Sequence, residues 1–251
     1  MNKKTIREAA GLMGAAERVY VLSGAGMSTE SGIPDFRSPK TGLWEKMDPV
    51  KTSSVDALMQ DPEQFYRVAF KRYSSLIGTE PNIGHYALAE MEQLGFIRGV
   101  ITQNIDGLHK KAGTRRLFEV HGHVRTCRCL SCGKRHAMEE LLMQLEKDLP
   151  LPKCSKCPGM LRPDIVLFGD PMAEDYFAAL EALQTDCDLL VVAGSSLSVY
   201  PVAAMPGMVS RLIIINLQPT PFDREARVVI QEKCGETLSA ILAELKGRPG
   251  S

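Results

Sequence analysis

The sequence predicts an α/β protein built on a doubly wound parallel sheet. Short apolar runs recur at Val19–Leu22, Val100–Thr102, Leu189–Ala193 and Leu212–Asn216. They are nearly continuous in Val, Ile and Leu, which is typical of strands that are buried on both faces. Helical patterns separate these runs. Alternation of strands with helices indicates a doubly wound fold that binds ligands at the carboxyl ends of its strands.

Two segments between the strands have apolar residues at helical spacing. The first stripe consists of Ile83, Ala87, Leu88, Met91 and Leu94. The second consists of Tyr176, Phe177, Leu180 and Leu183. Gly95 follows the first stripe directly and is a residue type that commonly ends a helix. We therefore expect a helix that packs on the sheet in each segment.

Composition limits the class of protein. The chain has 251 residues, 44% of them apolar and 24% charged, a balance that is ordinary for a globular protein. Lys plus Arg and Asp plus Glu both number 30, which argues against a general binder of nucleic acid or anionic membranes. No apolar run approaches the length of a membrane span or a signal peptide. We expect a cytoplasmic protein whose seven cysteines are reduced.

Residues 123–163 break the alternation and predict an inserted module that binds zinc. Cys129 and Cys132 form one Cys-x-x-Cys pair, and Cys154 and Cys157 form a second pair 21 residues further on. Two such pairs supply the four thiolates of a tetrahedral zinc site, and four protein ligands leave no position for a catalytic water. Cys127 is a rival ligand that fits the spacing less well. Two further cysteines, Cys187 and Cys234, stand alone and are interpreted as buried thiols.

A glycine turn follows the first predicted strand. Gly24 and Gly26 come directly after Val19–Leu22 and Ser23, where backbone N–H groups can approach phosphate oxygens. Thr29 occupies the place of the third glycine in the strict dinucleotide fingerprint, so a plain strand-to-helix turn remains an alternative. Residues 31–39 contain too many glycines and prolines for a helix. They predict a loop that covers a bound cofactor, although a merely solvated loop is the alternative.

Polar residues lie where two further strands end. Gln103, Asn104 and Asp106 follow Val100–Thr102, where amide and carboxylate groups can bind a ribose and a carboxamide. A turn capped by the Asn104 and Asp106 side chains is the alternative. His121 follows a shorter strand-like run, and a histidine at such a place can act as a general base, although single histidines are more often structural.

Two later segments complete the expected site. Gly194, Ser195 and Ser196 follow Leu189–Ala193 and offer N–H and hydroxyl donors to phosphate. Asn216 ends the last run, where it can meet an adenosine ribose. The extended segment 164–170 follows the cysteine module, and the edge of such a segment can accept a peptide as an extra strand.

Taken together, these motifs resemble those of the sirtuins, the NAD-dependent protein lysine deacylases, over nearly the whole chain. The motifs are 24–28 (GAGMS), 32–37 (GIPDFR), 102–106 (TQNID), 121–122 (HG), the two cysteine pairs, 194–197 (GSSL) and 215–216 (IN). The resemblance implies a catalytic core of the bacterial or archaeal type. It implies a Rossmann-like large domain, roughly 1–122 and 164–247, and a small domain that holds module 123–163 and part of the helical segment 40–80.

The resemblance also implies the roles of individual residues. His121 is the implied general base, and NAD is the implied co-substrate beside one structural zinc ion. The residues implied to contact NAD are Gly24, Ala25, Gly26, Ser28, Asp35, Phe36, Arg37, Gln103, Asn104, Asp106, Gly194, Ser195, Ser196, Asn216 and Cys234. Those implied to flank the acyl-lysine of a protein or peptide substrate are Val166, Phe168, Gly169 and Val199.

The reaction that the resemblance implies consumes NAD. The acyl oxygen of the substrate lysine attacks C1′ of the nicotinamide ribose, nicotinamide departs, and His121 takes a proton from a ribose hydroxyl. Attack of water on the resulting intermediate then releases lysine and, from acetyl-lysine, O-acetyl-ADP-ribose. Two alternatives remain from the sequence, namely mono-ADP-ribosyl transfer at the same NAD site and a non-catalytic NAD-sensing protein.

Overall fold

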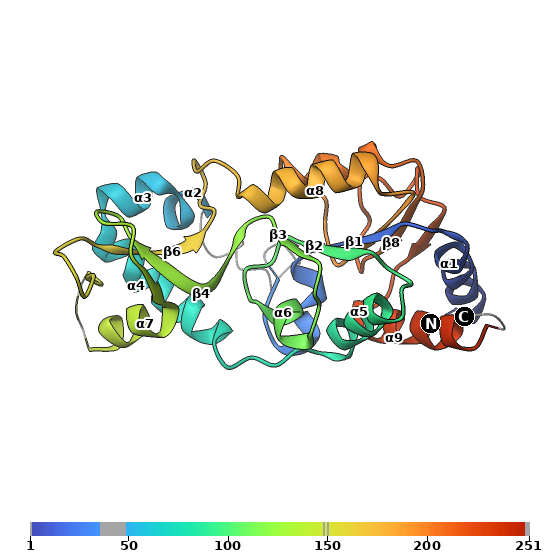
Figure 1. Ribbon diagram of the computed structural model, residues 1–251, viewed down its shortest axis with the longest axis horizontal. Helices are drawn as coiled ribbons and strands as arrows, with labels where there is room; N and C mark the ends of the chain where they lie inside the picture. Colours follow the sequence, from blue (N-terminus) through green and yellow to red (C-terminus); the bar gives the residue numbers. More distant parts are fainter. Residues whose placement is uncertain (1, 36–48, 148, 150, 249–251) are drawn as a thin grey trace.

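The computed structural model describes residues 2–35, 49–147, 149 and 151–248. Its larger sheet has six parallel strands in the order β3-β2-β1-β7-β8-β9 (Figure 1). These strands are β1 (Val19–Ser23), β2 (Gly99–Thr102), β3 (Leu117–Glu119), β7 (Leu189–Ala193), β8 (Leu212–Ile215) and β9 (Val228–Ile230). The chain winds outward in one direction from β1 and in the other from β7, as in a Rossmann-like sheet. The doubly wound parallel sheet predicted from the apolar runs is confirmed.

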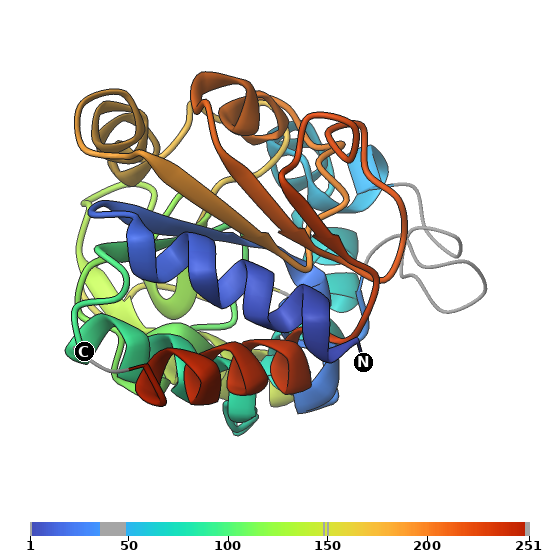
Figure 2. The same ribbon diagram turned by 90° about the vertical axis from the view of Figure 1, so that its right-hand side faces the viewer.

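Helices cover both faces of this sheet (Figure 2). Helices α1 (Lys3–Ala15), α5 (Ile83–Gln93) and α9 (Cys234–Lys246) share one apolar core with the sheet. Helix α8 (Glu174–Thr185) and the 3-10 helix η4 (Val202–Met208) share a second core on the opposite face. All five residues of β1 and all five of β7 are buried, which explains why their sequences are apolar without alternation.

Both helices predicted from apolar spacing are present, but their stripes include residues that are exposed. Ile83 and Leu94 are 53% and 50% exposed, because Ile83 begins α5 and Leu94 follows its last helical residue. Phe177 is 60% exposed on α8. It lies two residues before the buried Ala179, a step that turns a side chain by about 200° around a helix. These three assignments to the buried faces were wrong.

A smaller antiparallel sheet has the order β5-β4-β6, with β4 (Gly122–Cys129), β5 (Arg135–Ala137) and β6 (Leu161–Ile165). Four helices lie beside it, namely α2 (Pro49–Ser53), α3 (Val55–Gln60), α4 (Pro62–Leu76) and α7 (Met138–Glu146). One apolar core joins Leu58 of α3 and Phe65 of α4 to Leu141 of α7 and Leu161 of β6. The cysteine-rich segment therefore does not form its own core, and helices from residues 55–76 complete it.

Candidate active site

Two glycine turns meet at the point where the sheet changes winding direction, between β1 and β7. A Cβ added to Gly24 would lie 2.8 Å from the Gly194 carbonyl oxygen, and one added to Gly26 would lie 2.9 Å from the Gly194 Cα. The Gly26 N–H donates to the Gly194 carbonyl at 2.8 Å. Gly194 itself has a φ of 67°, in the left-handed region. The backbones approach so closely at Gly24, Gly26 and Gly194 that a side chain added at any of these positions would collide, and ligands of doubly wound folds bind at such a switch point.

Short helical turns follow Gly24, where a longer helix follows in the strict fingerprint. They are η1 (Ala25–Met27) and η2 (Thr29–Ser31). Asn82, which caps α5, donates from Nδ2 to the Met27 carbonyl at 2.8 Å and to Ser31 Oγ at 3.1 Å. The Glu30 carboxylate accepts a hydrogen bond of 2.6 Å from the Gly235 N–H at the start of α9. Asn82 and Glu30 therefore fix this loop, although neither was identified from the sequence.

Ser28 links the two polar residues that follow β2. Its hydroxyl donates to Asp106 Oδ2 at 2.7 Å and accepts from Asn104 Nδ2 at 3.1 Å. Asn104 Nδ2 also donates to the Gly24 carbonyl at 2.9 Å. Burial raises the pKa of Asp106, against hydrogen bonds from the Leu108 N–H and from Ser28. The motif 102–106 and the glycine turn thus form one polar cluster at the carboxyl edge of the sheet.

Gln103 connects the ends of strands β2 and β7 across the end of β1. Its Nε2 donates to Ser195 Oγ at 2.8 Å, and its backbone N–H donates to the Ser23 carbonyl at 3.0 Å. Ser195 is buried, whereas Ser196 is partly exposed and contacts Ser198 Oγ at 2.7 Å. Residues predicted from three separate strand ends therefore lie side by side.

His121 lies at the same edge, two residues beyond β3. Its Nδ1 lies 2.8 Å from the Gln103 carbonyl oxygen, which can only accept, so Nδ1 carries the hydrogen and Nε2 keeps a free lone pair. Burial lowers the pKa of His121, and the bond to Gln103 opposes this shift. The ring is therefore neutral near pH 7 and has a nitrogen ready to accept a proton.

Two other histidines lie beneath the site, and no local sequence pattern indicated their position. The rings of His85 and His109 are buried, with centroids 4.7 Å apart. His109 Nε2 lies 2.9 Å from Ser23 Oγ, which donates to Thr102 Oγ1. Burial lowers the pKa of both histidines, that of His85 to about 4. They are neutral parts of the core that support the end of β2.

The residues expected at the adenosine end lie further from the cluster. Asn216 follows β8 and donates from Nδ2 to the Gln218 carbonyl at 2.7 Å. Cys234 begins α9, and its side chain is buried in the core, with the thiol donating to the Ile215 carbonyl at 3.6 Å. Burial raises the pKa of Cys234 to about 12. Asp35 is partly buried, and Phe36 and Arg37 lie outside the described residues.

The segment after β6 runs between His121 and the helices beside the small sheet. The Val166 N–H donates to the His121 carbonyl at 2.9 Å. Phe168 pairs with residues 53–55, since its N–H donates to the Ser53 carbonyl at 3.0 Å and its carbonyl accepts from the Val55 N–H at 2.9 Å. The Phe168 side chain is 40% exposed, and Gly169 has a φ of 93°. Val199 is partly exposed in the loop after β7.

The four predicted cysteines converge on one point. One ligand atom of each of Cys129, Cys132, Cys154 and Cys157 lies within 4.8 Å of all the others. The sulfur of Cys129 lies 3.5 Å from that of Cys157, and the sulfur of Cys132 lies 3.8 Å from that of Cys154. Tetrahedral Zn–S bonds of about 2.3 Å require sulfurs about 3.8 Å apart, so the four thiolates fit zinc.

Cys127 is not part of this cluster. Its thiol is fully buried and donates to the Ala137 carbonyl at 3.5 Å. Burial raises its pKa to about 12, which disfavours the thiolate that a zinc ligand needs. The rival ligand considered from the sequence is therefore a core residue.

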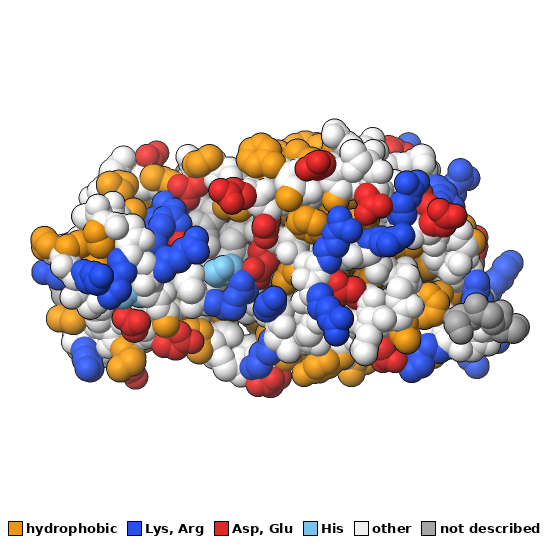
Figure 3. Space-filling view, in the orientation of Figure 1, with side chains coloured by type: hydrophobic (Ala, Val, Ile, Leu, Met, Phe, Trp, Pro, Cys, Tyr) orange, Lys and Arg blue, Asp and Glu red, His pale blue; other side chains and the backbone are white. Residues whose placement is uncertain are grey.

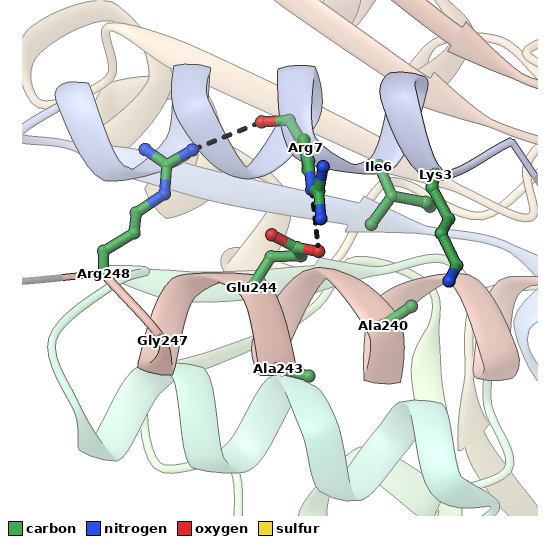
Figure 4. Close-up of a pocket in the computed structure, with 8 residues that line it drawn as sticks. All are labelled: Lys3, Ile6, Arg7, Ala240, Ala243, Glu244, Gly247 and Arg248. Carbon is green, nitrogen blue, oxygen red and sulfur yellow. Dashed lines mark hydrogen bonds and ion pairs between the residues drawn. The ribbon is translucent and has the colours of Figure 1, made fainter.

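A groove between α1 and α9 lies apart from these strand ends. Figure 4 shows that Arg7 and Glu244 face each other across it, with a distance of 3.3 Å between Arg7 Nε and Glu244 Oε1. Arg248 donates to the Arg7 carbonyl at 3.2 Å. Both partners of the ion pair are exposed, and nothing in this groove resembles the polar cluster at the strand ends.

The surface does not present a field of one sign. On the face in Figure 3, Lys and Arg side chains are interspersed with Asp and Glu. Among the described residues, the structure contains no helix that is long and apolar enough to cross a membrane.

Comparison with known proteins agrees with these features. The model of the Sir2 family matches residues 24–201. A protein of Caldanaerobacter subterraneus subsp. tengcongensis named NAD-dependent protein deacetylase 2 is 53% identical over 240 residues, which cover 96% of each chain. An NAD-dependent protein deacetylase of Caldivirga maquilingensis is 44% identical and covers 96% of this chain and 94% of its own.

Solved structures show the same likeness. A Sir2 variant with a deacetylated p53 peptide and 3′-O-acetyl ADP ribose superposes with a TM-score of 0.90, at 35% identity over 95% of this chain and 98% of that one. A Sir2 complex with p53 peptide and NAD+ superposes with a TM-score of 0.86, at 35% identity over 97% and 98%. The sequence motifs, the fold and these relatives agree, and the chain belongs to the Sir2 family.

Proposed function

We propose that the protein is an NAD-dependent protein lysine deacetylase. It transfers the acetyl group of acetyl-lysine to ADP-ribose and releases nicotinamide and O-acetyl-ADP-ribose. One observation carries this proposal above the others, namely the hydrogen bond that orients His121 through the backbone of Gln103, beside Asn104 and Asp106. The names of the relatives support the same activity.

The two glycine turns are the proposed phosphate site for the NAD substrate. The N–H groups of Gly24, Gly26 and Gly194 donate to backbone carbonyls within the fold, so the proposed role of these glycines is to let phosphate oxygens approach the backbone with no side chain in the way. Ala25, Ser195 and Ser196 belong to the same turns. Asn216 is proposed for the adenosine ribose, and Cys234 for a backbone contact only, because its side chain is buried in the core.

The polar cluster is the proposed site for the nicotinamide end. Gln103 and Asn104 are assigned to the ribose and Asp106 to the carboxamide. Ser28 holds Asn104 and Asp106 in a fixed relation through two hydrogen bonds, so the cluster is organised before NAD arrives. Asp35, Phe36 and Arg37 are proposed for the loop that covers the cofactor.

His121 is the proposed general base. Its Nδ1–H is held by a carbonyl, which leaves Nε2 as the atom that takes a proton from a ribose hydroxyl. Because burial lowers the pKa of the ring, His121 is not already protonated at neutral pH. A histidine is suited to this task because its proton affinity lies near the working pH.

The acyl-lysine is proposed to enter beside segment 166–169. The Val166 N–H donates to the carbonyl of the proposed base, and the Phe168 side chain is partly exposed next to Gly169, which has a positive φ. Val199, in the loop after β7, is proposed to flank the acyl-lysine on the side opposite segment 166–169. An extended substrate peptide would add a strand here, which recognises the backbone and leaves the lysine to provide specificity. Acetylated proteins or peptides are therefore the proposed partners.

A single assay tests this function. An acetyl-lysine peptide is incubated with NAD and the protein, and mass spectrometry measures deacetylated peptide, nicotinamide and O-acetyl-ADP-ribose. We expect all three products in equal amounts. Nicotinamide release with an unacetylated peptide, accompanied by ADP-ribose on that peptide, would instead indicate ADP-ribosyl transfer. Failure to release nicotinamide under both conditions would contradict the proposed activity.

Two further assignments accompany this proposal. We propose a cytoplasmic location, because four cysteines arranged for zinc require reduced thiols. We also propose that each sheet is the centre of one domain, with module 123–163 in the small one. The shared core of α3 and α4 with β6 supports placing residues 55–76 there as well.

A further inference from the structure

A buried histidine contacts one of the zinc cysteines from outside the four-thiolate cluster. His136 Nε2 lies 3.3 Å from the sulfur of Cys154. On the other side of the ring, Nδ1 lies 2.9 Å from Glu140 Oε2. His136 belongs to β5 and is 5% exposed, whereas Glu140 comes four positions later, in the first turn of α7. The three side chains form a chain that runs from the surface to the zinc site.

The chemistry of both neighbours fixes the role of the ring. A carboxylate and a zinc-bound thiolate are hydrogen-bond acceptors, so a histidine placed between them donates from both nitrogens. Cys154 already receives a backbone N–H from Lys156 at 3.4 Å, the usual donor in such a turn. Cys129 likewise receives backbone N–H groups from Ser131 and Cys132. His136 thus gives Cys154 an additional donor from a side chain.

The electrostatics of the centre give this donor a function. Zinc with charge +2 and four thiolates with charge −1 each leave a net charge of −2. Cys154 is buried, and it packs in the same apolar core as Leu141 and Leu161. A negative sulfur in such surroundings is costly unless it is hydrogen-bonded. The His136 ring is hydrogen-bonded to Glu140 through its other nitrogen, and a donor that is oriented in this way also orients the thiolate it contacts.

We infer that His136, oriented by Glu140, is a positioning residue of the zinc centre, and that its bond to Cys154 slows the loss of zinc. The role belongs to the metal site and is independent of the proposed deacetylation. The ring does not replace a cysteine, because the four sulfurs already form the complete set that fits a tetrahedral ion.

The test measures zinc release from the full-length protein loaded with one zinc per chain. A chromogenic chelator in excess reports the release rate. We expect His136→Phe, which has an aromatic ring without a donor, to release zinc about ten to a hundred times faster, because loss of such a partner usually lowers metal affinity by that factor and we expect the loss to appear in the release rate. His136→Gln should recover part of the retention, because its Nε2 can donate to the same sulfur.

Variants of helix α7 separate this role from a general loss of stability. Glu140→Ala should accelerate release by a smaller factor, since the ring keeps its donor but loses its support. Glu139→Ala is the matched control, because Glu139 is an exposed neighbour on the same first turn, and it should leave the rate unchanged. Thermal unfolding of each zinc-loaded variant shows whether the fold is intact.

Two results would overturn the inference. The first is a His136→Phe protein that folds and releases zinc at the rate of the unchanged protein. The second result applies if His136→Phe does not fold. In that case, equal rates of zinc release from Glu140→Ala and Glu139→Ala would overturn the inference. The Glu140 side chain is 54% exposed, so its removal leaves the core in place. It also removes the 3.4 Å bond from the Ala137 N–H at the start of α7, and thermal unfolding of the zinc-loaded variant measures that separate loss.

Discussion

Gln103 and His121 are joined by a 2.8 Å hydrogen bond between the Gln103 carbonyl and His121 Nδ1, although they lie 18 positions apart in the chain. The two residues come from the ends of neighbouring parallel strands, β2 and β3. The same Gln103 uses its side chain to reach Ser195 beyond β7. Gln103 therefore connects the proposed base to the proposed phosphate site. Its carbonyl binds Nδ1 of His121, which leaves Nε2 as the nitrogen that can accept a proton.

Replacement of the proposed base should separate catalysis from binding. We expect His121→Ala to lower deacetylation by on the order of a hundredfold or more, the usual contribution of a general base. NAD should still bind, because the glycine turns do not depend on the ring. Steady-state kinetics and calorimetric titration with NAD measure the two effects. Near-normal turnover in this variant would remove His121 from the mechanism.

The pH dependence of the reaction should reflect the burial of His121. A base acts in its neutral form, and burial lowers its pKa, so activity should persist below the ordinary histidine value of about 6.5 and fall only as pH drops through the lowered value. A profile of kcat/KM against pH tests this. An acidic limb centred above about 6.5 would contradict the assignment.

The contact between the glycine turns should make Gly194 sensitive to any side chain. We expect Gly194→Ala to lose at least about 1–3 kcal/mol of stability through its positive φ alone, and more because its Cβ would collide with the backbone of Gly26 and Met27. NAD binding should weaken with it. Denaturant unfolding and NAD titration measure these changes.

Gly113→Ala is the matched control for the previous variant. Gly113 also has a positive φ, 101°, but an added Cβ would meet no atom within 4 Å. It should show the backbone cost without the collision and without an effect on NAD binding. Equal losses for the two variants would show that the close approach of the turns is unimportant.

Zinc should be present at one ion per chain and should stabilise the small sheet. We expect Cys129→Ser to lose zinc and to unfold at a lower temperature, because metal binding contributes folding free energy. Cys127→Ala should keep its zinc, since Cys127 points to backbone carbonyls of residues 136 and 137. Elemental analysis and thermal unfolding decide, and a zinc-free Cys129→Ser protein of unchanged stability would contradict a structural role.

Much of the architecture could be predicted because a strand that is buried on both faces has a nearly continuous apolar sequence. Val19, Leu189 and Leu212 each begin a run that the parallel sheet encloses. The helix stripes were less informative. Phe177 and Leu94 have the composition of core residues, but one lies on the outer side of α8 and the other beyond the end of α5. Periodicity cannot show where a helix stops touching the sheet.

The site was predictable where a motif is continuous and not where it is assembled by folding. Gln103, Asn104 and Asp106 stand together in the chain, and each cysteine pair has the Cys-x-x-Cys spacing that is typical of zinc sites. Glu30 capping α9 and His136 contacting Cys154 depend on contacts between distant segments, for which no local pattern exists. Asn82 did carry a signal, since it stands directly before a predicted helix and asparagine is a preferred N-cap residue.

The pairing of Gly122 with Ile165 has a mechanical consequence. Gly122 begins β4 and Ile165 ends β6, so two crossings of the chain between the larger and the smaller sheet run side by side. His121 directly precedes β4 and Val166 directly follows β6, and the Val166 N–H donates to the His121 carbonyl. Because the two crossings are bonded to each other, the proposed base and the segment proposed to receive the acyl-lysine are held in one register.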